Sequence, residues 1–84
     1  MKIIKITASW CPSCLIMNSM IDDIIKKYNL EMTSLDFDLD QEEVSKYNID
    51  TILPVLIKVD DDNNEISRIK GEKSVKEIEK FIEG

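Results

Sequence analysis

The chain has 84 residues, 43% hydrophobic and 33% charged, a balance typical of one small globular domain rather than a disordered segment. Seventeen acidic residues against eleven basic ones give a formal net charge of -6, which disfavours binding to nucleic acids or to anionic membrane surfaces. The sequence has no histidine, so Ser-His and Cys-His catalytic machinery within the chain is excluded.

No targeting or membrane segment is expected. The apolar start, Met1 to Ile6, is interrupted by Lys5 and is too short for the core of a signal peptide. No stretch approaches the roughly 18 apolar residues of a membrane span. We therefore expect a cytoplasmic protein, where a cysteine pair serves catalysis or metal binding more often than cross-linking. No linker or repeat divides the sequence, which predicts one domain over residues 1–84.

The chain opens with a predicted strand and a long helix. β-Branched residues indicate a strand over 3–7. A helix is expected to begin at Pro12, because proline in the first turn loses no helical hydrogen bond. Apolar residues then recur with the 3.6-residue period of one helix face from Ile16 to Tyr28, and Asn29 is the expected end.

A second strand and a short helix follow. The segment 32–38 alternates as a strand does, with Leu35 and Phe37 on one side and two aspartates, Asp36 and Asp38, on the other. Asp40 is positioned to cap a short helix over 41–47. The alternating aspartates are interpreted as the polar side of the strand and not as metal ligands.

The second half predicts a hairpin and a final helix. Pro54 precedes an apolar strand over 55–59, and a turn rich in Asp and Asn leads into a partner strand over 65–70. Gly71 ends that strand, and Ser74 opens a capping box ahead of the last helix. The order is therefore β-α-β-α-β-β-α. The first two strands must be parallel because a long helix joins them, and we expect an α/β fold with a four-stranded mixed sheet flanked by helices.

The cysteine pair carries the chemistry. Cys11 lies in the N-cap region of the long helix, where unpaired N–H groups and the helix dipole favour negative charge. A thiolate there would be stabilised, and the thiolate is the attacking species in disulfide exchange. Cys14, one turn further on, is within reach to resolve a mixed disulfide and is expected to be less exposed and less acidic.

Three other interpretations of the pair carry less weight. A zinc half-site needs two further ligands, and the chain has no other Cys and no His. A structural disulfide would close a loop too small to stabilise much and would be reduced in the cytosol. Two buried cysteines packed as small apolar residues remain a third interpretation. Redox exchange is the favoured one.

With these motifs in place, the sequence resembles the thioredoxin superfamily. The resemblance is carried by Trp10-Cys11-Pro12-Ser13-Cys14 on a strand-to-helix turn, by Tyr47-Asn48-Ile49, by Pro54 ahead of an apolar strand and by Gly71 before the last helix. It implies a minimal thioredoxin-like fold, Cys11 as nucleophile and Cys14 as resolving thiol. It also implies a cis bond before Pro54, in a loop that faces the cysteines and offers the backbone of Leu53 to an extended substrate. The residues it implies for substrate contact are Trp10, Pro12, Ser13, Leu53 and Pro54.

Departures from the family pattern leave the subfamily open. The chain begins at the strand before the cysteines, as glutaredoxins do, whereas Trp10 is a thioredoxin feature. Ser13 stands where glutaredoxins usually carry tyrosine, and their paired glycines are absent around Gly71. Lys5 lies six residues before Cys11, where thioredoxins often carry a buried aspartate.

Lys5 is a candidate for tuning the pKa of the cysteines. If its cation approached the sulfurs, it would lower the thiolate pKa and make the pair more oxidising. The expectation from so flexible a side chain is instead that it extends to solvent.

The sequence thus predicts a thioredoxin-like thiol–disulfide oxidoreductase that reduces protein disulfides through Cys11 and Cys14. We expect a monomer without cofactor or metal, acting on a disulfide-containing protein and recharged by an electron donor such as a thioredoxin reductase or glutathione. One alternative is a glutathione-dependent, glutaredoxin-like protein. The other is a dimer that binds a metal or an iron–sulfur centre through the cysteines of two chains.

Overall fold

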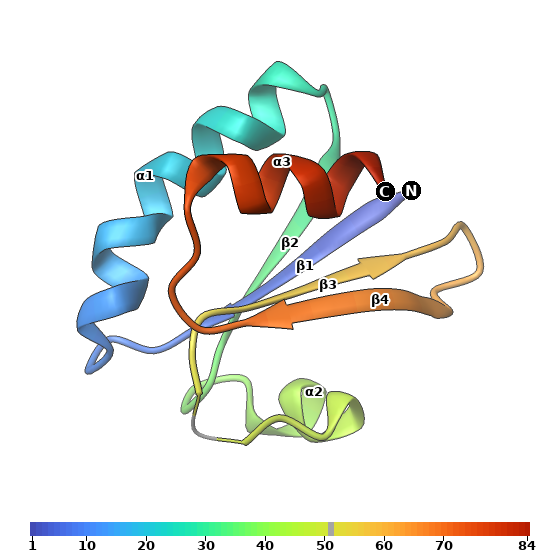
Figure 1. The fold of residues 1–84 in the computed structure, drawn as a ribbon. Coiled ribbons are helices and arrows are strands. Elements are labelled where there is room, and N and C mark those ends of the chain that lie inside the picture. The colour runs from blue at the N-terminus through green and yellow to red at the C-terminus, as the bar shows by residue number, and fades with distance from the viewer. Residues whose placement is uncertain (51) are drawn as a thin grey trace.

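The computed structural model describes residues 1–50 and 52–84. Its centre is a four-stranded sheet in the order β2-β1-β3-β4 (Figure 1). The strands are β1 (Lys2–Thr7), β2 (Glu31–Asp36), β3 (Val55–Val59) and β4 (Glu65–Lys70). β1 and β2 are parallel, and β3 is antiparallel to both β1 and β4. The expected mixed sheet, with a parallel first pair and a C-terminal hairpin, is confirmed.

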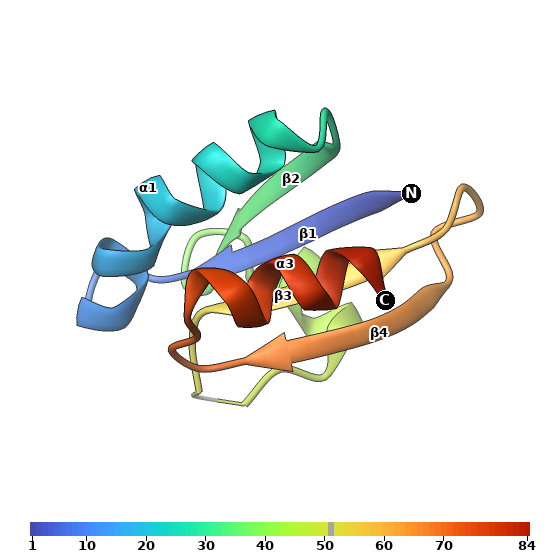
Figure 2. The same cartoon turned by 45° about the horizontal axis from the view of Figure 1, so that its top comes forward.

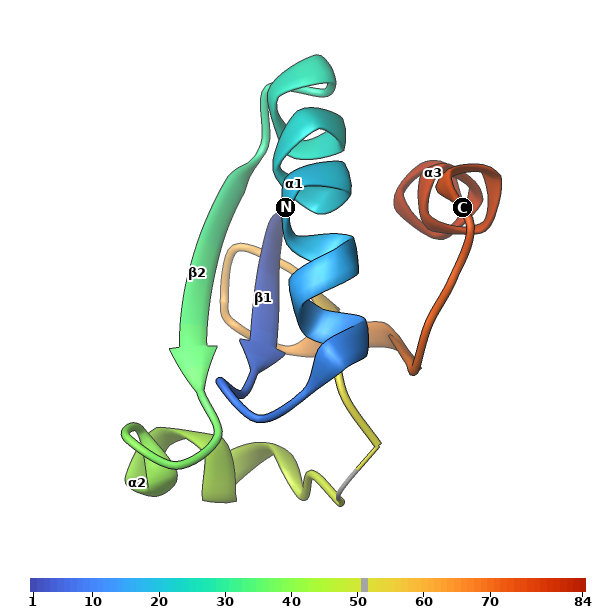
Figure 3. The same ribbon diagram turned by 90° about the vertical axis from the view of Figure 1, so that its left-hand side faces the viewer.

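Helices cover both faces of the sheet. α1 (Pro12–Lys27) and α3 (Val75–Glu83) lie side by side on one face, whereas α2 (Gln41–Val44) and the 3-10 turn η1 (Ser45–Tyr47) lie on the other (Figures 2 and 3). The local signals act as predicted. The side chain of Ser74 caps α3 in a reciprocal capping box with Glu77, and Asn29 ends α1 with a left-handed φ of 54°.

Two apolar cores result, one on each face. Between the sheet and helices α1 and α3 pack residues such as Ile3, Met17, Ile21, Leu56 and Ile78. On the α2 face lie Ile4, Ile6, Val44, Val55, Ile57 and both cysteines. Every residue of β3 is buried, because this strand lies inside the sheet with helices over both of its faces.

Two lysines are buried despite this apolar setting. Lys58 on β3 donates from Nζ to the backbone oxygen of Phe81 at 2.9 Å, near the end of α3 where the last carbonyls lack helical partners. Lys5 on β1 is the other.

The segment after β2 differs from the prediction. The strand ends at Asp36, whose carboxylate accepts hydrogen bonds from the backbone N–H groups of Asp38 and Leu39 at 2.9 Å and so turns the chain. The predicted alternation of Asp36 and Asp38 on a strand is therefore wrong. Asp40 occupies the N-cap position of α2, but its carboxylate accepts from the N–H of Asp36 and does not cap the helix. The expected helix over 41–47 divides into α2 and η1.

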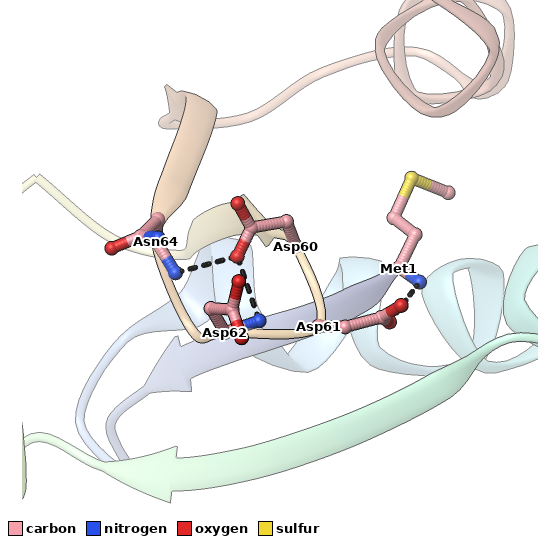
Figure 4. A network of polar contacts seen from close by, with 5 residues as sticks. All are labelled: Met1, Asp60, Asp61, Asp62 and Asn64. Atoms are coloured by element: carbon pink, nitrogen blue, oxygen red, sulfur yellow. Dashed lines mark hydrogen bonds and ion pairs between the residues drawn. The ribbon is translucent and has the colours of Figure 1, made fainter.

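The acidic loop between β3 and β4 is a turn, as expected. The carboxylate of Asp60 accepts the backbone N–H groups of Asp62 and Asn64, each at 2.9 Å (Figure 4). Asp61 lies 3.3 Å from the amino group of Met1 and ties the turn to the start of β1. The run of aspartates is therefore explained by the hydrogen bonds that shape this turn. Among the residues described, no helix is long and apolar enough to cross a bilayer.

Candidate dithiol site

Cys11 is placed by the turn that leads from β1 into α1. Its backbone N–H donates to the carbonyl of Ala8 at 3.2 Å, and its extended backbone makes it the N-cap of the helix. The sulfur accepts the N–H of Cys14 at 3.3 Å. One of the unpaired N–H groups at the start of α1 is thus directed at Sγ, an arrangement that favours negative charge on the sulfur. The predicted N-cap position is confirmed.

Cys14 lies one helical turn further in and is the more deeply buried of the two. Its exposed fraction is 1%, against 6% for Cys11, and both cysteines are free thiols. Burial raises the pKa of the Cys14 thiol to about 11, and its hydrogen bond with Cys11 contributes in the same direction. A backbone contact with Ala8 and the cation of Lys5 act against this rise. The expected greater burial of Cys14 is confirmed.

The loop before β3 faces the pair. The Leu53–Pro54 bond is cis, as the resemblance implied. The thiol of Cys11 donates to the carbonyl oxygen of Leu53 at 3.6 Å, across 42 positions of sequence. The carbonyl of Pro54 accepts the N–H of Gly71 at 2.9 Å, and Gly71 has a φ of 84°, a conformation that residues with a side chain rarely adopt. Leu53 and Pro54 are themselves buried, so their side chains support the loop from inside.

Trp10 forms one exposed edge of the site. Its ring is 52% exposed and meets Phe37 edge-on at 6.0 Å between ring centres. Its indole Nε1 donates to the carboxylate of Asp38 at 2.7 Å. Pro12 is exposed and Ser13 half-buried on the first turn of α1. The role of Asp38 in holding Trp10 was missed, because it depends on the turn that replaces the end of the predicted second strand.

Two apolar side chains beside the cysteines are exposed, and for one of them this differs from the prediction. Leu15 and Ile16 are 66% and 63% exposed. Ile16 was counted in the buried stripe of the helix, but the buried positions of α1 are Cys14, Met17, Ile21, Ile24 and Ile25. The buried stripe therefore begins at Cys14 and continues at Met17, and Ile16 lies outside it on the exposed side of the helix.

The expectation that Lys5 extends to solvent is wrong. Its side chain is 8% exposed, and Nζ lies 3.6 Å from Oδ1 of Asp22 on α1. A buried ammonium is costly without a partner, and the helix that covers β1 supplies the carboxylate. The side chain of Asp22 is itself half exposed, so the ion pair lies at the edge of the interior.

The raised pKa of Cys14 predicts that the reduced protein loses stability as the pH rises from about 9 towards 11. In the unfolded chain the thiol has its ordinary pKa of 9.0 and ionises first, so above that pH unfolding releases a proton and becomes more favourable. The measurement is the free energy of unfolding in reducing buffer at pH 8 and pH 10, for the wild type and Cys14→Ser. The variant should show the smaller loss, and equal losses in the two proteins would contradict the prediction.

The mixed sheet, the Cys-x-x-Cys pair at the start of α1 and the facing cis-proline loop define a thioredoxin-like fold with its dithiol motif. The thioredoxin family model matches residues 1–84, and the chain belongs to this family. No curated protein matches it.

Within residues 1–50 and 52–84, no group of three or more Cys, Asp or Glu side chains is arranged to hold a metal ion.

Solved thioredoxin structures share the fold at low sequence identity. Thioredoxin 1 of Thermosipho africanus is 25% identical, with a TM-score of 0.80 over 99% of this chain and 91% of its own. Thioredoxin-2 of the malaria parasite is 19% identical, with a TM-score of 0.85 over 96% of this chain and 79% of its own. Mitochondrial thioredoxin 3 of Saccharomyces cerevisiae is 23% identical, with a TM-score of 0.84 over 96% of this chain and 74% of its own.

Proposed function

We propose that this protein is a thiol–disulfide oxidoreductase that reduces protein disulfides by dithiol exchange. The Cys11 thiolate attacks one sulfur of the substrate disulfide; a Cys11–substrate bond forms, the substrate S–S bond breaks, and the second substrate sulfur leaves as a thiolate that takes a proton from water. Cys14, as a thiolate, then attacks Sγ of Cys11. The Cys11–Cys14 disulfide forms and the first substrate sulfur departs with the electron pair. Two electrons have passed to the substrate, and an external donor must restore the dithiol.

The observation that carries this proposal is the placement of the two sulfurs at the start of α1. The N–H of Cys14 donates to Sγ of Cys11, so the nucleophile is supported by the helix terminus. The second thiol lies one turn away and is buried. Water and foreign thiols therefore have poor access to Cys14. Cys11, one helical turn away, is the sulfur that Cys14 is placed to attack.

The surroundings of the pair support contact with an extended substrate segment. The carbonyl of Leu53 already accepts a hydrogen bond from Cys11 and lies where a substrate backbone would approach the sulfur. We assign the rest of the contact surface to Trp10, Pro12, Ser13 and the Pro54 loop. The broad exposed ring of Trp10 supplies apolar area next to the nucleophile. We place the protein in the cytoplasm, because that compartment keeps such dithiols reduced. We also propose that it acts as a monomer.

The test is NADPH-coupled reduction of a small disulfide-bonded protein, with thioredoxin reductase in one arm and glutathione with its reductase in the other. Cys11→Ser is the matched control, because it replaces a single sulfur by oxygen. We expect the wild type to turn over with at least one of the two donors, and Cys11→Ser to show no turnover above background with either. Turnover with glutathione alone would favour the glutaredoxin-like alternative. No turnover with either donor, together with metal bound at a stoichiometry of one per two chains, would overturn the proposal in favour of the dimeric metal module.

A further inference from the structure

The outer edge of the sheet at β4 is unpaired. β4 pairs with β3 along one side, and among the described residues no backbone hydrogen bond reaches its other side. The register shift opposite Lys58 and Val59 disturbs only the start of β4, so the strand continues regularly from Ser67 to Lys70. The outward N–H and C=O groups of this edge are therefore available to another extended chain.

A groove runs beside this edge, between β4 and α3. The two elements run in opposite directions from the loop 71–74 that joins them, and so flank the groove along its length (Figures 1 and 2). The groove has a volume of about 480 Å³. Ile69 of β4 and Phe81 of α3 line it, and both are partly buried against the core between the sheet and the two long helices. The groove therefore has an apolar floor.

The charge of the groove is opposite to that of the whole chain. The protein has a net charge of -6, whereas the charged residues that line the groove are Arg68, Lys73, Lys80 and Glu77. Arg68 is paired with Glu65, and the carboxylate of Glu77 is engaged in the capping box of α3. Lys73 and Lys80 have no ion-pair partner among the described residues, so their charges are available to a ligand.

These two lysines lie at opposite ends of the apolar floor. Lys73 follows the end of β4, where its backbone N–H donates to Sδ of Met17 at 3.4 Å and ties the loop to α1. Lys80 precedes Phe81, and the carbonyl of Phe81 accepts a hydrogen bond from Lys58, the register partner of Ser67 near the start of β4. The groove is thus basic, apolar and basic in turn along the strand.

This order matches the side chains of an extended peptide. Every second side chain of a strand points to the same face, at a spacing of about 6–7 Å. A chain paired with β4 would therefore direct alternate side chains into the groove. An apolar residue with an acidic residue two positions before it and another two positions after it would complement the floor and both lysines.

We propose that the edge of β4 and this groove form a docking site for an extended acidic segment of a partner protein. The segment adds to the sheet as a further strand beside β4, rests an apolar side chain on Ile69 and Phe81, and pairs its carboxylates with Lys73 and Lys80. Backbone pairing supplies the affinity, and the two lysines select the acidic sequence. The site shares no residue with the dithiol, so it does not depend on the function proposed above.

The probe is a synthetic peptide of about nine residues, blocked at both ends, in which glutamate, isoleucine and glutamate alternate with threonine. The peptide is titrated into the reduced full chain labelled with ¹⁵N, and the backbone amide signals are followed by NMR. We expect the signals of Ser67 to Lys70, Lys73 and Phe81 to move together, and the outward amides of β4 to gain protection from hydrogen exchange. A peptide with the same side chains and N-methylated backbone cannot donate to the strand and should not bind.

Two charge-reversal variants test the role of the lysines. Lys73→Glu combined with Lys80→Glu should weaken binding about tenfold or more, since two ion pairs become like-charge contacts. Lys26→Glu combined with Lys46→Glu is the matched control. It changes the net charge equally, and both of its lysines are exposed and lie outside the groove. Circular dichroism confirms that each variant is folded.

Loss of binding in the groove variant, with near wild-type affinity in the control, supports the proposal. No shift of the β4 amides at millimolar peptide, equal weakening in both variants, or equal binding of the N-methylated peptide overturns it. A dimer of the wild type that the groove variant abolishes would assign the edge to a second copy of the chain and also overturn it. None of these readouts involves a redox step, so a protein without reductase activity would leave the result intact.

Discussion

Replacing Cys14 by serine is expected to stop the reaction at the mixed disulfide. Cys11 keeps its place at the N-terminus of α1 and the backbone N–H that points at its sulfur, so it still attacks the substrate. The resolving sulfur is gone, and release then requires a second thiol from solution. Loss of the high effective concentration of Cys14 should reduce turnover with thioredoxin reductase by at least about a hundredfold.

The adduct itself is the clearest readout. Cys14→Ser incubated with a disulfide-bonded protein should give one covalent complex on a non-reducing gel, which a reductant dissolves. Cys11→Ser should give none, because Cys14 is 1% exposed and its thiol pKa is raised to about 11. An adduct in Cys11→Ser and none in Cys14→Ser would reverse the two roles. Turnover of Cys14→Ser equal to the wild type would show that one thiol suffices, as a glutathione-dependent mechanism allows.

Ile57→Ala is expected to produce the largest loss of stability. Ile57 lies at the middle of β3, is fully buried, and packs in the α2-side core with Ile4 and Val55. Removing its outer carbons from this close-packed site forfeits their burial and leaves a cavity, at a cost of about 2–5 kcal/mol. For a domain of this size that is a large share of the free energy of unfolding, which is roughly 0.05–0.15 kcal/mol per residue.

The measurement is denaturant unfolding of the reduced protein, followed by the emission of its single tryptophan, Trp10, and by circular dichroism. Ile66→Ala on β4 is the matched control, since that side chain is 54% exposed and its loss should cost less than about 1 kcal/mol. If Ile57→Ala fails to fold, Ile57→Val should still cost about 0.5–1.5 kcal/mol. Equal losses at positions 57 and 66 would contradict this account of the core.

The order of the elements and the identity of the dithiol could be predicted from sequence because both depend on neighbours along the chain. Pro12 starts α1, Asn29 ends it and Ser74 caps α3 through contacts within a few residues. The position of Cys11 at a helix N-cap follows from the same local signals. The parallel pairing of β1 and β2 follows from the length of the helix that connects them.

After β2, the local sequence did not decide between a strand and a turn. Extended and turned conformations of 36–40 are both compatible with alternating aspartates. The turn is favoured because the carboxylate of Asp36 bonds to the backbone N–H groups of Asp38 and Leu39, in competition with continued strand pairing. The turn thereby brings Asp38 to the indole of Trp10, and no pattern in the sequence predicts this contact.

By itself, then, the sequence determined the fold class, the topology and the cysteine pair, since hydrophobic period, capping residues and motif spacing are local. Only the tertiary structure decided what surrounds that pair. It brings the carbonyl of Leu53 to Cys11 and buries Lys5 against Asp22. A lysine alone prefers water, and its burial depends on a carboxylate that another element supplies when the helix packs on the sheet. The motif itself places the N–H of Cys14 at the sulfur of Cys11, whereas the burial that raises the pKa of Cys14 depends on the packed elements.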